Sequence, residues 1–256
     1  MKRAKFQAWI PWLDAAAIAA WGFLMLKYWV TDKLNILIHP AYTWLCIVGG
    51  LGLLAIGGFR LVELWQQRRR KLSLNPAIPS MEHTTLFPPG WGSMLLLSAA
   101  IMGILITPRP FASHAALEVG VTDILSATRS QPQSFRASKN PEERTLIDWI
   151  RTLNVYPEPT AYEGQKVNLT GFVIHPPDFP PDYFVVSRFV ITCCAADAYP
   201  VGLPVRLPEN ATEYDADTWL KVEGEMGVTR LLDVRKLVIV AESLEEVPEP
   251  ENPYDS

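Results

Sequence analysis

The stretch "AYTWLCIVGGLGLLAIGGF", residues 41–59, contains no charged side chain and indicates the class of protein to which this chain belongs. A helix that crosses the hydrocarbon core of a bilayer needs roughly 20 predominantly apolar residues. Residues 41–59 approach that length, and Tyr42 and Trp44 stand near their start, where membrane helices place interfacial aromatic residues. The stretch therefore predicts a membrane-spanning helix.

Two further apolar blocks lie on either side of this stretch. The first, "LDAAAIAAWGFLMLKYWV" at 13–30, carries only Asp14 and Lys27 near its ends, and the second, "GWGSMLLLSAAIMGILIT" at 90–107, carries no charge. The first is too long for the apolar part of a cleaved signal peptide and shows no convincing small-residue cleavage site. We expect three transmembrane helices, near 12–30, 41–62 and 90–107. Two spans with a re-entrant third segment are the alternative.

The distribution of basic residues predicts the orientation of these helices. Lys2, Arg3 and Lys5 precede the first block, and the run "RRRK" at 68–71 follows the second. Basic loops stay on the cytoplasmic side of a membrane. We therefore expect a cytoplasmic N-terminus in a cell membrane protein, and an extracytoplasmic domain after Thr107.

The two halves of the chain carry opposite net charge. Residues 1–107 hold 10 Lys and Arg against 4 Asp and Glu, whereas residues 108–256 hold 13 against 23. Binding to nucleic acid depends largely on neutralising phosphates with basic side chains. An acidic exported half with a net charge of −10 therefore predicts no nucleic-acid partner, and it suits cations better than anions.

Residues 108–139 are expected to form a juxtamembrane connector with one short helix near Thr122–Thr128. The next segment, "NPEERTLIDWIRTLN" at 140–154, predicts an amphipathic helix. Asn140 is expected to cap it, with Pro141 at the first helical position and Glu143 completing a capping box. Its apolar face either packs on the domain that follows or docks on a partner or the membrane surface. The residues of that face are Leu146, Ile147, Trp149, Ile150 and Leu153.

Beyond this helix the pattern changes to short β-rich runs separated by turn residues. Five strands are expected, at 166–174, 183–193, 202–207, 219–228 and 235–247. Gly171 would mark a bend in the first strand, as in a small closed sheet. We therefore expect an all-β, OB-like barrel domain within 140–247, with a small sandwich as the alternative. The remaining acidic, proline-rich tail, 248–256, is expected to be disordered.

The most unusual residues of the exported half are two adjacent cysteines in "RFVITCCAADAYP", 188–200. On a regular strand, side chains alternate, so Cys193 would face the core and Cys194 would face outward. The pair would form one site only if a turn at 195–197 brought the two side chains together. Thiolates prefer soft metal ions, and the candidate metal ligands are Cys193, Cys194, Asp197 and His175. Structural thiols and a strained, labile disulfide are the alternatives.

A second dense stretch, "HPPDFPPDYF" at 175–184, predicts a stiff loop between the first two strands. It displays Asp178 and Asp182, which could join Asp197 in an oxygen-rich cation site, although a rigid exposed turn explains the prolines equally well. No nucleophile elbow, P-loop, HExxH or dinucleotide fingerprint is present, so we do not expect an enzyme.

Three motifs of this chain resemble those of the YcgQ-like bacterial membrane proteins. They are "TPRPFASHAA" at 107–116, "LTGFVIH" at 169–175 and "ITCCAADAYPVGLPV" at 191–205. Members of that family are described as partner subunits of a permease, so the resemblance implies a permease partner. It implies no catalytic residue and no particular cofactor or substrate.

The leading hypothesis from the sequence is an integral membrane accessory subunit of a permease, in contact with the lipid bilayer. Its exported OB-like domain would capture or gate a solute, such as a metal ion or another soft ligand. One alternative is a membrane-anchored extracytoplasmic thiol redox or sensor protein, with a reactive thiolate at Cys194. The other is a non-catalytic assembly factor, for which neither cysteine would matter.

Overall fold

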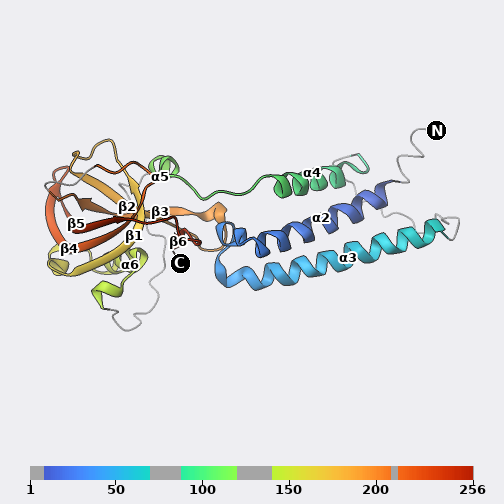
Figure 1. Cartoon of the computed structure of the whole chain (residues 1–256), viewed down its shortest axis with the longest axis horizontal. Helices are drawn as coiled ribbons and strands as arrows, with labels where there is room; N and C mark the ends of the chain where they lie inside the picture. The colour runs from blue at the N-terminus through green and yellow to red at the C-terminus, as the bar shows by residue number, and fades with distance from the viewer. Residues whose placement is uncertain (1–8, 70–87, 120–139, 209–212, 256) are drawn as a thin grey trace. The chain divides into compact units, whose positions relative to one another are not determined.

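The computed structural model describes residues 9–69, 88–119, 140–208 and 213–255 of the chain (Figure 1). The chain divides into two compact units, Met1–Arg109 and Pro110–Ser256. The expected short helix at 122–128 lies outside the described residues.

The described residues of the first unit form three helices joined by short turns and loops. They are α2 (Ile10–Val30), α3 (Thr43–Arg69) and α4 (Trp91–Leu105), with 3-10 turns η1 (Lys33–Ile36) and η2 (Pro40–Tyr42) between α2 and α3. By length and composition, α2 and the continuous segment Pro40–Arg69 are each able to cross a membrane. At 15 residues, α4 falls short of the roughly 20 that a span requires. Two of the three expected spans therefore have the length of a membrane helix.

Small residues let α2 and α3 approach each other closely. A Cβ atom at Gly22 would lie 2.8 Å from the carbonyl oxygen of Gly50, and one at Gly57 would lie 2.8 Å from the backbone nitrogen of Ala19. Small residues at helix contacts are typical of membrane helices, because they allow backbone-to-backbone packing. Alanine at either glycine would force the two helices apart.

Polar side chains of α2 that would be costly in lipid find partners on α4. Asp14 accepts a hydrogen bond from Ser93 near one end, and Lys27 donates to the carbonyl oxygen of Ile104 near the other. Tyr28 donates to the carbonyl oxygen of Gly103. Both charged side chains of the first apolar block therefore have hydrogen-bond partners. Without them, each polar group would cost several kcal/mol in hydrocarbon.

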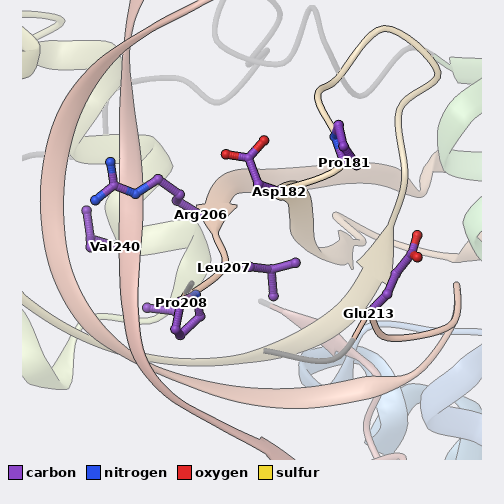
Figure 2. Close-up of a pocket in the computed structure, with 8 residues that line it drawn as sticks. Pro181, Asp182, Arg206, Leu207, Pro208, Glu213 and Val240 are labelled. Carbon is purple, nitrogen blue, oxygen red and sulfur yellow. The ribbon is translucent and has the colours of Figure 1, made fainter. Parts of the chain in front are cut away.

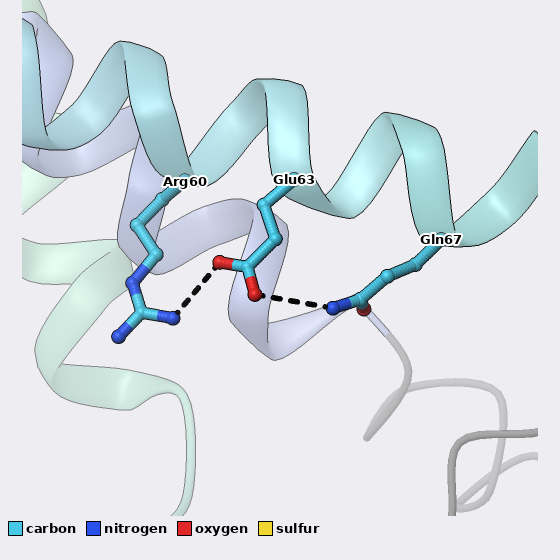
Figure 3. Close-up of polar contacts among 3 residues, drawn as sticks. All are labelled: Arg60, Glu63 and Gln67. Atoms are coloured by element: carbon cyan, nitrogen blue, oxygen red, sulfur yellow. Dashed lines mark hydrogen bonds and ion pairs between the residues drawn. The ribbon is translucent and has the colours of Figure 1, made fainter.

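A second polar group lies toward the end of α3, where the sequence becomes basic. Glu63 forms an ion pair with Arg60 at 3.1 Å and accepts a hydrogen bond from Gln67 at 3.3 Å (Figure 3).

The remainder of the α3 surface carries large apolar side chains that no other described part of the chain covers. They include Trp44, Leu45, Val48, Leu51, Ile56, Phe59 and Val62.

The second unit contains a sheet that closes on itself. Its strands are β1 (Lys166–Ile174), β2 (Tyr183–Val190), β3 (Tyr199–Arg206), β4 (Trp219–Leu231), β5 (Val234–Glu246) and β6 (Tyr254–Asp255). The first five pair in the order β1-β4-β5-β3-β2, and β2 pairs again with β1, so they form a ring. The five strands expected from the sequence are all present, although β2 ends three residues earlier than predicted.

Gly171 lies where the ring closes. β1 pairs with β4 from Lys166 to Phe172 and with β2 from Phe172 to Ile174. A Cβ atom at Gly171 would lie 2.6 Å from the carbonyl oxygen of Ser187, so only glycine permits this approach. The expectation that Gly171 marks a change of course in the first strand agrees with this geometry.

The amphipathic helix begins later than the sequence suggested. Pro141–Glu143 form a separate 3-10 turn, η4, and the helix α6 spans Leu146–Val155. Thr145 and Asp148, not Asn140 and Glu143, make the reciprocal capping box. The prediction was wrong because both segments match the capping pattern, and the apolar periodicity begins only at Leu146.

The apolar face of α6 is buried as expected, and it packs against β2 and β3. This confirms the first of the two readings, in which the helix covers the domain that follows. A further short helix, α5 (Ser113–Val119), precedes it, and 3-10 turns η5 (Pro159–Tyr162) and η6 (Ala195–Asp197) lie within the loops.

The acidic tail is ordered through β6, contrary to the prediction of disorder. Tyr254 and Asp255 pair in parallel with Phe189 and Val190 of β2, and Tyr254 is buried. The Arg188 side chain donates to the carbonyl oxygen of Asn252 at 2.8 Å. Composition predicted disorder because the tail is acidic and rich in proline. Composition does not reveal the burial of Tyr254 or the pairing with β2, which order the tail.

Candidate functional site

The two cysteines lie on a turn that begins where β2 ends. We call residues Thr192–Asp197 the cysteine turn. Ile191 is buried, but Thr192 and Cys193 are exposed and Cys194 is half-buried. The expected burial of Cys193 was wrong, because the alternation of a strand stops at Val190 and the chain turns away from the core.

Asp197 explains why the chain turns at this point. Its carboxylate accepts hydrogen bonds from three consecutive backbone N–H groups, those of Thr192 at 3.2 Å, Cys193 at 2.9 Å and Cys194 at 3.4 Å. Residues Ala195–Asp197 form the 3-10 turn η6, and the Asp197 N–H donates back to the carbonyl oxygen of Cys194. A single carboxylate therefore organises the backbone beneath both cysteines.

This turn brings the two sulfur atoms together. The Sγ atoms of Cys193 and Cys194 lie 3.6 Å apart, and both cysteines are free thiols. A disulfide requires about 2.05 Å between sulfurs, so the pair is in contact but not bonded. The sequence required a turn at 195–197 for the two cysteines to form one site, and the structure contains that turn.

The acid–base properties of the turn follow from its hydrogen bonds. The Asp197 carboxylate accepts from the Cys193 thiol and raises the pKa of that thiol to about 11, with a smaller contribution from Cys194. Partial burial acts to raise the pKa of Asp197, but the hydrogen bonds from Cys193 and its neighbours outweigh that effect and lower it. Near neutral pH, the turn therefore holds a protonated Cys193 thiol against an ionised Asp197.

The surroundings of the turn are partly aromatic. Tyr199, the first residue of β3, has a raised pKa because of burial, and it also senses the charges of Arg151 and Asp197. The ring of Phe111 lies 5.3 Å from that of Phe189, which precedes the turn by a few residues. The chain is thus buried at Ile191, just before the cysteine turn, whereas Cys193 is exposed to solvent.

His175 does not join the cysteines. It follows β1 directly, and the last residue of β1, Ile174, pairs with Val185 near the start of β2. The cysteine turn follows the other end of β2, which lies about 17 Å farther along the strand at roughly 3.3 Å per residue. His175 instead lies with Nε2 2.8 Å from the carbonyl oxygen of Tyr214.

The loop aspartates are also separated from the turn. Asp178 and Asp182 belong to the loop that joins β1 to β2, at the end of β2 opposite the cysteine turn. Within the described ranges, no three His, Cys, Asp or Glu side chains are grouped so as to hold a metal ion. The candidate ligand set therefore reduces to two thiols, with Asp197 engaged by the backbone beneath them.

A separate pocket lies where the ring is weakest. β3 and β5 pair through only two residue pairs, and a cavity of about 570 Å³ opens beside them (Figure 2). Its charged lining residues are Asp182, Arg206 and Glu213, and none of these side chains forms an ion pair within the described ranges. Sequence reasoning did not anticipate this pocket, since it depends on the short β3–β5 contact.

Comparison with known proteins gives one match. Residues 140–255 match the family model described as the DUF1980 C-terminal domain, a range that contains α6, the ring, the cysteine turn and β6. No curated protein matches the chain, and no solved structure does so either. The similarity therefore covers the ring domain, and it names no activity.

Proposed function

We propose that this chain is a non-enzymatic, membrane-anchored accessory subunit of a permease. In this proposal α2, α3 and α4 all reside in the bilayer of the cell membrane, the N-terminus is cytoplasmic and the ring domain is extracytoplasmic. The exposed apolar surface of α3 and the excess of basic residues around α2 and α3 support this arrangement. The short α4 would complete its span with flanking residues.

We further infer that the ring is an OB-like barrel. Five strands in a ring, with β3 and β5 joined by only two residue pairs, match the description of a partly open five-stranded barrel. Such barrels are frequent binding modules, and this supports a role in capturing or gating a solute.

The observation that carries the proposal is the pair of sulfurs 3.6 Å apart on a turn organised by Asp197. Two adjacent thiols, one of them exposed, suit a soft cation such as Cu(I). Each thiol releases one proton to solvent when its sulfur binds the ion. Cys193 and Cys194 would be the ligands, and Asp197 would position them through the backbone.

A direct test is a competition titration of the full chain in detergent with Cu(I) and a chromogenic chelator. The proposal predicts one tightly bound Cu(I) per chain and its loss in Cys193→Ala/Cys194→Ala. The control variant is Cys46→Ala, because Cys46 lies in α3 and is not part of the turn. Equal binding by the double variant and the control would contradict the proposal.

The permease association has its own test. The full chain is purified in mild detergent with an affinity tag, and co-purifying membrane proteins are identified by mass spectrometry. A polytopic transporter should be recovered in stoichiometric amount, and a chain that never brings a transporter with it would refute the association. This result is independent of metal binding at the cysteine turn.

The redox alternative is favoured by one observation, the contact between the two sulfurs in a domain that we place in an oxidising space. Against it stands the raised pKa of Cys193, because the thiolate is the reactive species. Alkylation of the native chain across pH decides the matter. If Cys194 reacts rapidly at neutral pH as a thiolate, the redox alternative is supported, and if neither thiol reacts, it fails.

An assembly factor is the remaining alternative, and it requires Cys193→Ala/Cys194→Ala to retain full cellular function.

A further inference from the structure

The hairpin that joins β4 to β5 ends in a strained turn. Leu231 and Val234 are the last residue pair, and the two residues between them have positive φ angles, 53° at Leu232 and 62° at Asp233. Two-residue hairpin loops of this kind strongly prefer Asn-Gly, because few other residues adopt the left-handed conformation. Leucine with positive φ is a genuine outlier. A bulky apolar residue therefore occupies the tip of a long hairpin at a conformational cost.

The apolar side chains of this tip do not contribute to the core. Leu232 is 44% exposed and Val234 is 57% exposed, whereas the neighbouring Leu231 and Leu237 are buried. Strain at an exposed position is not explained by packing within the domain. Backbone strain of this kind concentrates at functional positions.

The residues behind the tip are basic. Arg230 and Arg235 are directly opposite each other on β4 and β5, and both are exposed. Like charges opposite each other in an antiparallel pair are destabilising. Neither arginine forms an ion pair within the part of the chain that the structure describes, so no acidic side chain there offsets this repulsion.

A third basic side chain, that of Lys236, lies beside the loop that joins β1 to β2. Lys236 lies with its Nζ 5.9 Å from the ring centre of Phe179, in the loop between β1 and β2. Within 229–236 the only acidic residue is Asp233, although residues 108–256 as a whole carry a net charge of −10. The tip is therefore a basic and apolar exception on an acidic domain.

We propose that this tip, Arg230–Lys236, is a docking element for an anionic membrane surface. Leu232 and Val234 would enter the headgroup region, and Arg230, Arg235 and Lys236 would contact lipid phosphates. Exposed aliphatic residues backed by cations are the pattern by which interfacial elements bind anionic lipid. The negative charge of lipid phosphates beside the two arginines would also offset the Arg230–Arg235 repulsion.

A lipid surface fits this tip better than an acidic protein does, for two reasons on the molecule. The chain already carries two helices long enough to cross a membrane, so a bilayer is always within its reach. Anionic headgroups repel a domain with a net charge of −10, whereas the three basic side chains of this tip attract them. Docking would therefore set the orientation of the ring domain on the membrane, a consequence that does not depend on metal binding or on a permease.

The test uses the full chain in nanodiscs of phosphatidylcholine alone or with phosphatidylglycerol. In a Cys46→Ala/Cys193→Ala/Cys194→Ala background, Asp233→Cys carries an environment-sensitive fluorophore. The proposal predicts a blue shift and reduced quenching by acrylamide only in the anionic nanodiscs. Each arginine near an anionic surface strengthens binding about fivefold, so Arg230→Gln/Arg235→Gln should weaken docking about 25-fold.

A matched control removes two cations elsewhere on the ring, with Lys166→Gln/Lys221→Gln, and should keep the blue shift. Because a label at Asp233 can disturb the turn, hydrogen exchange of the unlabelled 229–237 segment provides a second readout, with protection expected only in anionic nanodiscs. The proposal is overturned if the tip remains exposed in both kinds of nanodisc. It is also overturned if Arg230→Gln/Arg235→Gln leaves the protection in anionic nanodiscs unchanged. Protection that appears only with a co-purified protein would make the tip a protein-docking site and would also overturn it.

Discussion

Asp197→Asn is the substitution that most sharply tests how the cysteine turn controls its thiols. The carboxylate of Asp197 is the largest cause of the raised pKa of Cys193, about 11. Asparagine keeps an oxygen that can accept from the backbone but removes the negative charge. The pKa of Cys193 should then fall toward the usual value of about 8.5.

The expected magnitude follows from the two pKa values. At pH 8, a thiol with a pKa of about 11 is roughly 0.1% ionised, and one with a pKa of about 8.5 is roughly 24% ionised, an increase of about 200-fold. A less basic thiolate is a weaker nucleophile, which removes about tenfold of that gain. The alkylation rate of Cys193 should therefore rise by up to about 20-fold.

The assay measures iodoacetamide labelling of Cys193 at pH 8 in a Cys46→Ala background, with fragment-ion mass spectrometry to separate Cys193 from Cys194. Asp178→Asn is the matched control, because Asp178 lies in the loop between β1 and β2, at the other end of β2. It should leave the rate unchanged. If Asp197→Asn leaves the rate within about twofold of its parent or lowers it, the assignment of Asp197 as the controlling charge is wrong.

Three further predictions concern the ring and its tail. Gly171→Ala should destabilise the ring domain by ~1–3 kcal/mol, because its Cβ would meet the Ser187 backbone; the measurement is thermal denaturation followed by near-ultraviolet circular dichroism. Gly227→Ala should cost less, because the close contact of its Cβ is with a valine side chain, and the nearest backbone atom is 4.0 Å away. Thr145→Ala should cost about 1 kcal/mol in the same measurement by removing the α6 cap, and an unchanged melting temperature would contradict the capping box. Tyr254 should titrate at about 12, because burial raises its pKa, so the tail contact persists below pH ~10 and is lost as pH rises through about 12. In absorbance titrations at tyrosinate wavelengths, Tyr254→Phe should remove this late step, and its persistence would refute the assignment.

Periodicity predicted the elements of the ring domain that depend on local sequence. The first strand was predicted at 166–174, and β1 spans Lys166–Ile174. The buried face of α6 was also predicted, because apolar residues at helical spacing leave little choice of face. The start of α6 was missed because two capping patterns lie five residues apart, although the apolar periodicity that begins at Leu146 favours the second.

The sequence identified the cysteines of the candidate site but not the conformation of the turn that carries them. Adjacent cysteines drew attention, yet strand alternation misplaced Cys193, because no local rule says that β2 ends at Val190. The signal that was available is the acidic residue at 197, within reach of the N–H groups of 192–194 as a turn cap. The docked tail could not be predicted, because its order depends on the distant contact between Tyr254 and β2.

The central claim is that Cys193 and Cys194 together form one binding site for a soft cation. X-ray absorption at the copper edge tests it most directly, on the full chain loaded with one equivalent of Cu(I). The account predicts two sulfur ligands per copper in the native chain and in Cys46→Ala, and no bound copper in Cys193→Ala/Cys194→Ala. Copper surrounded only by nitrogen and oxygen, or the same spectrum in the double variant, would contradict it.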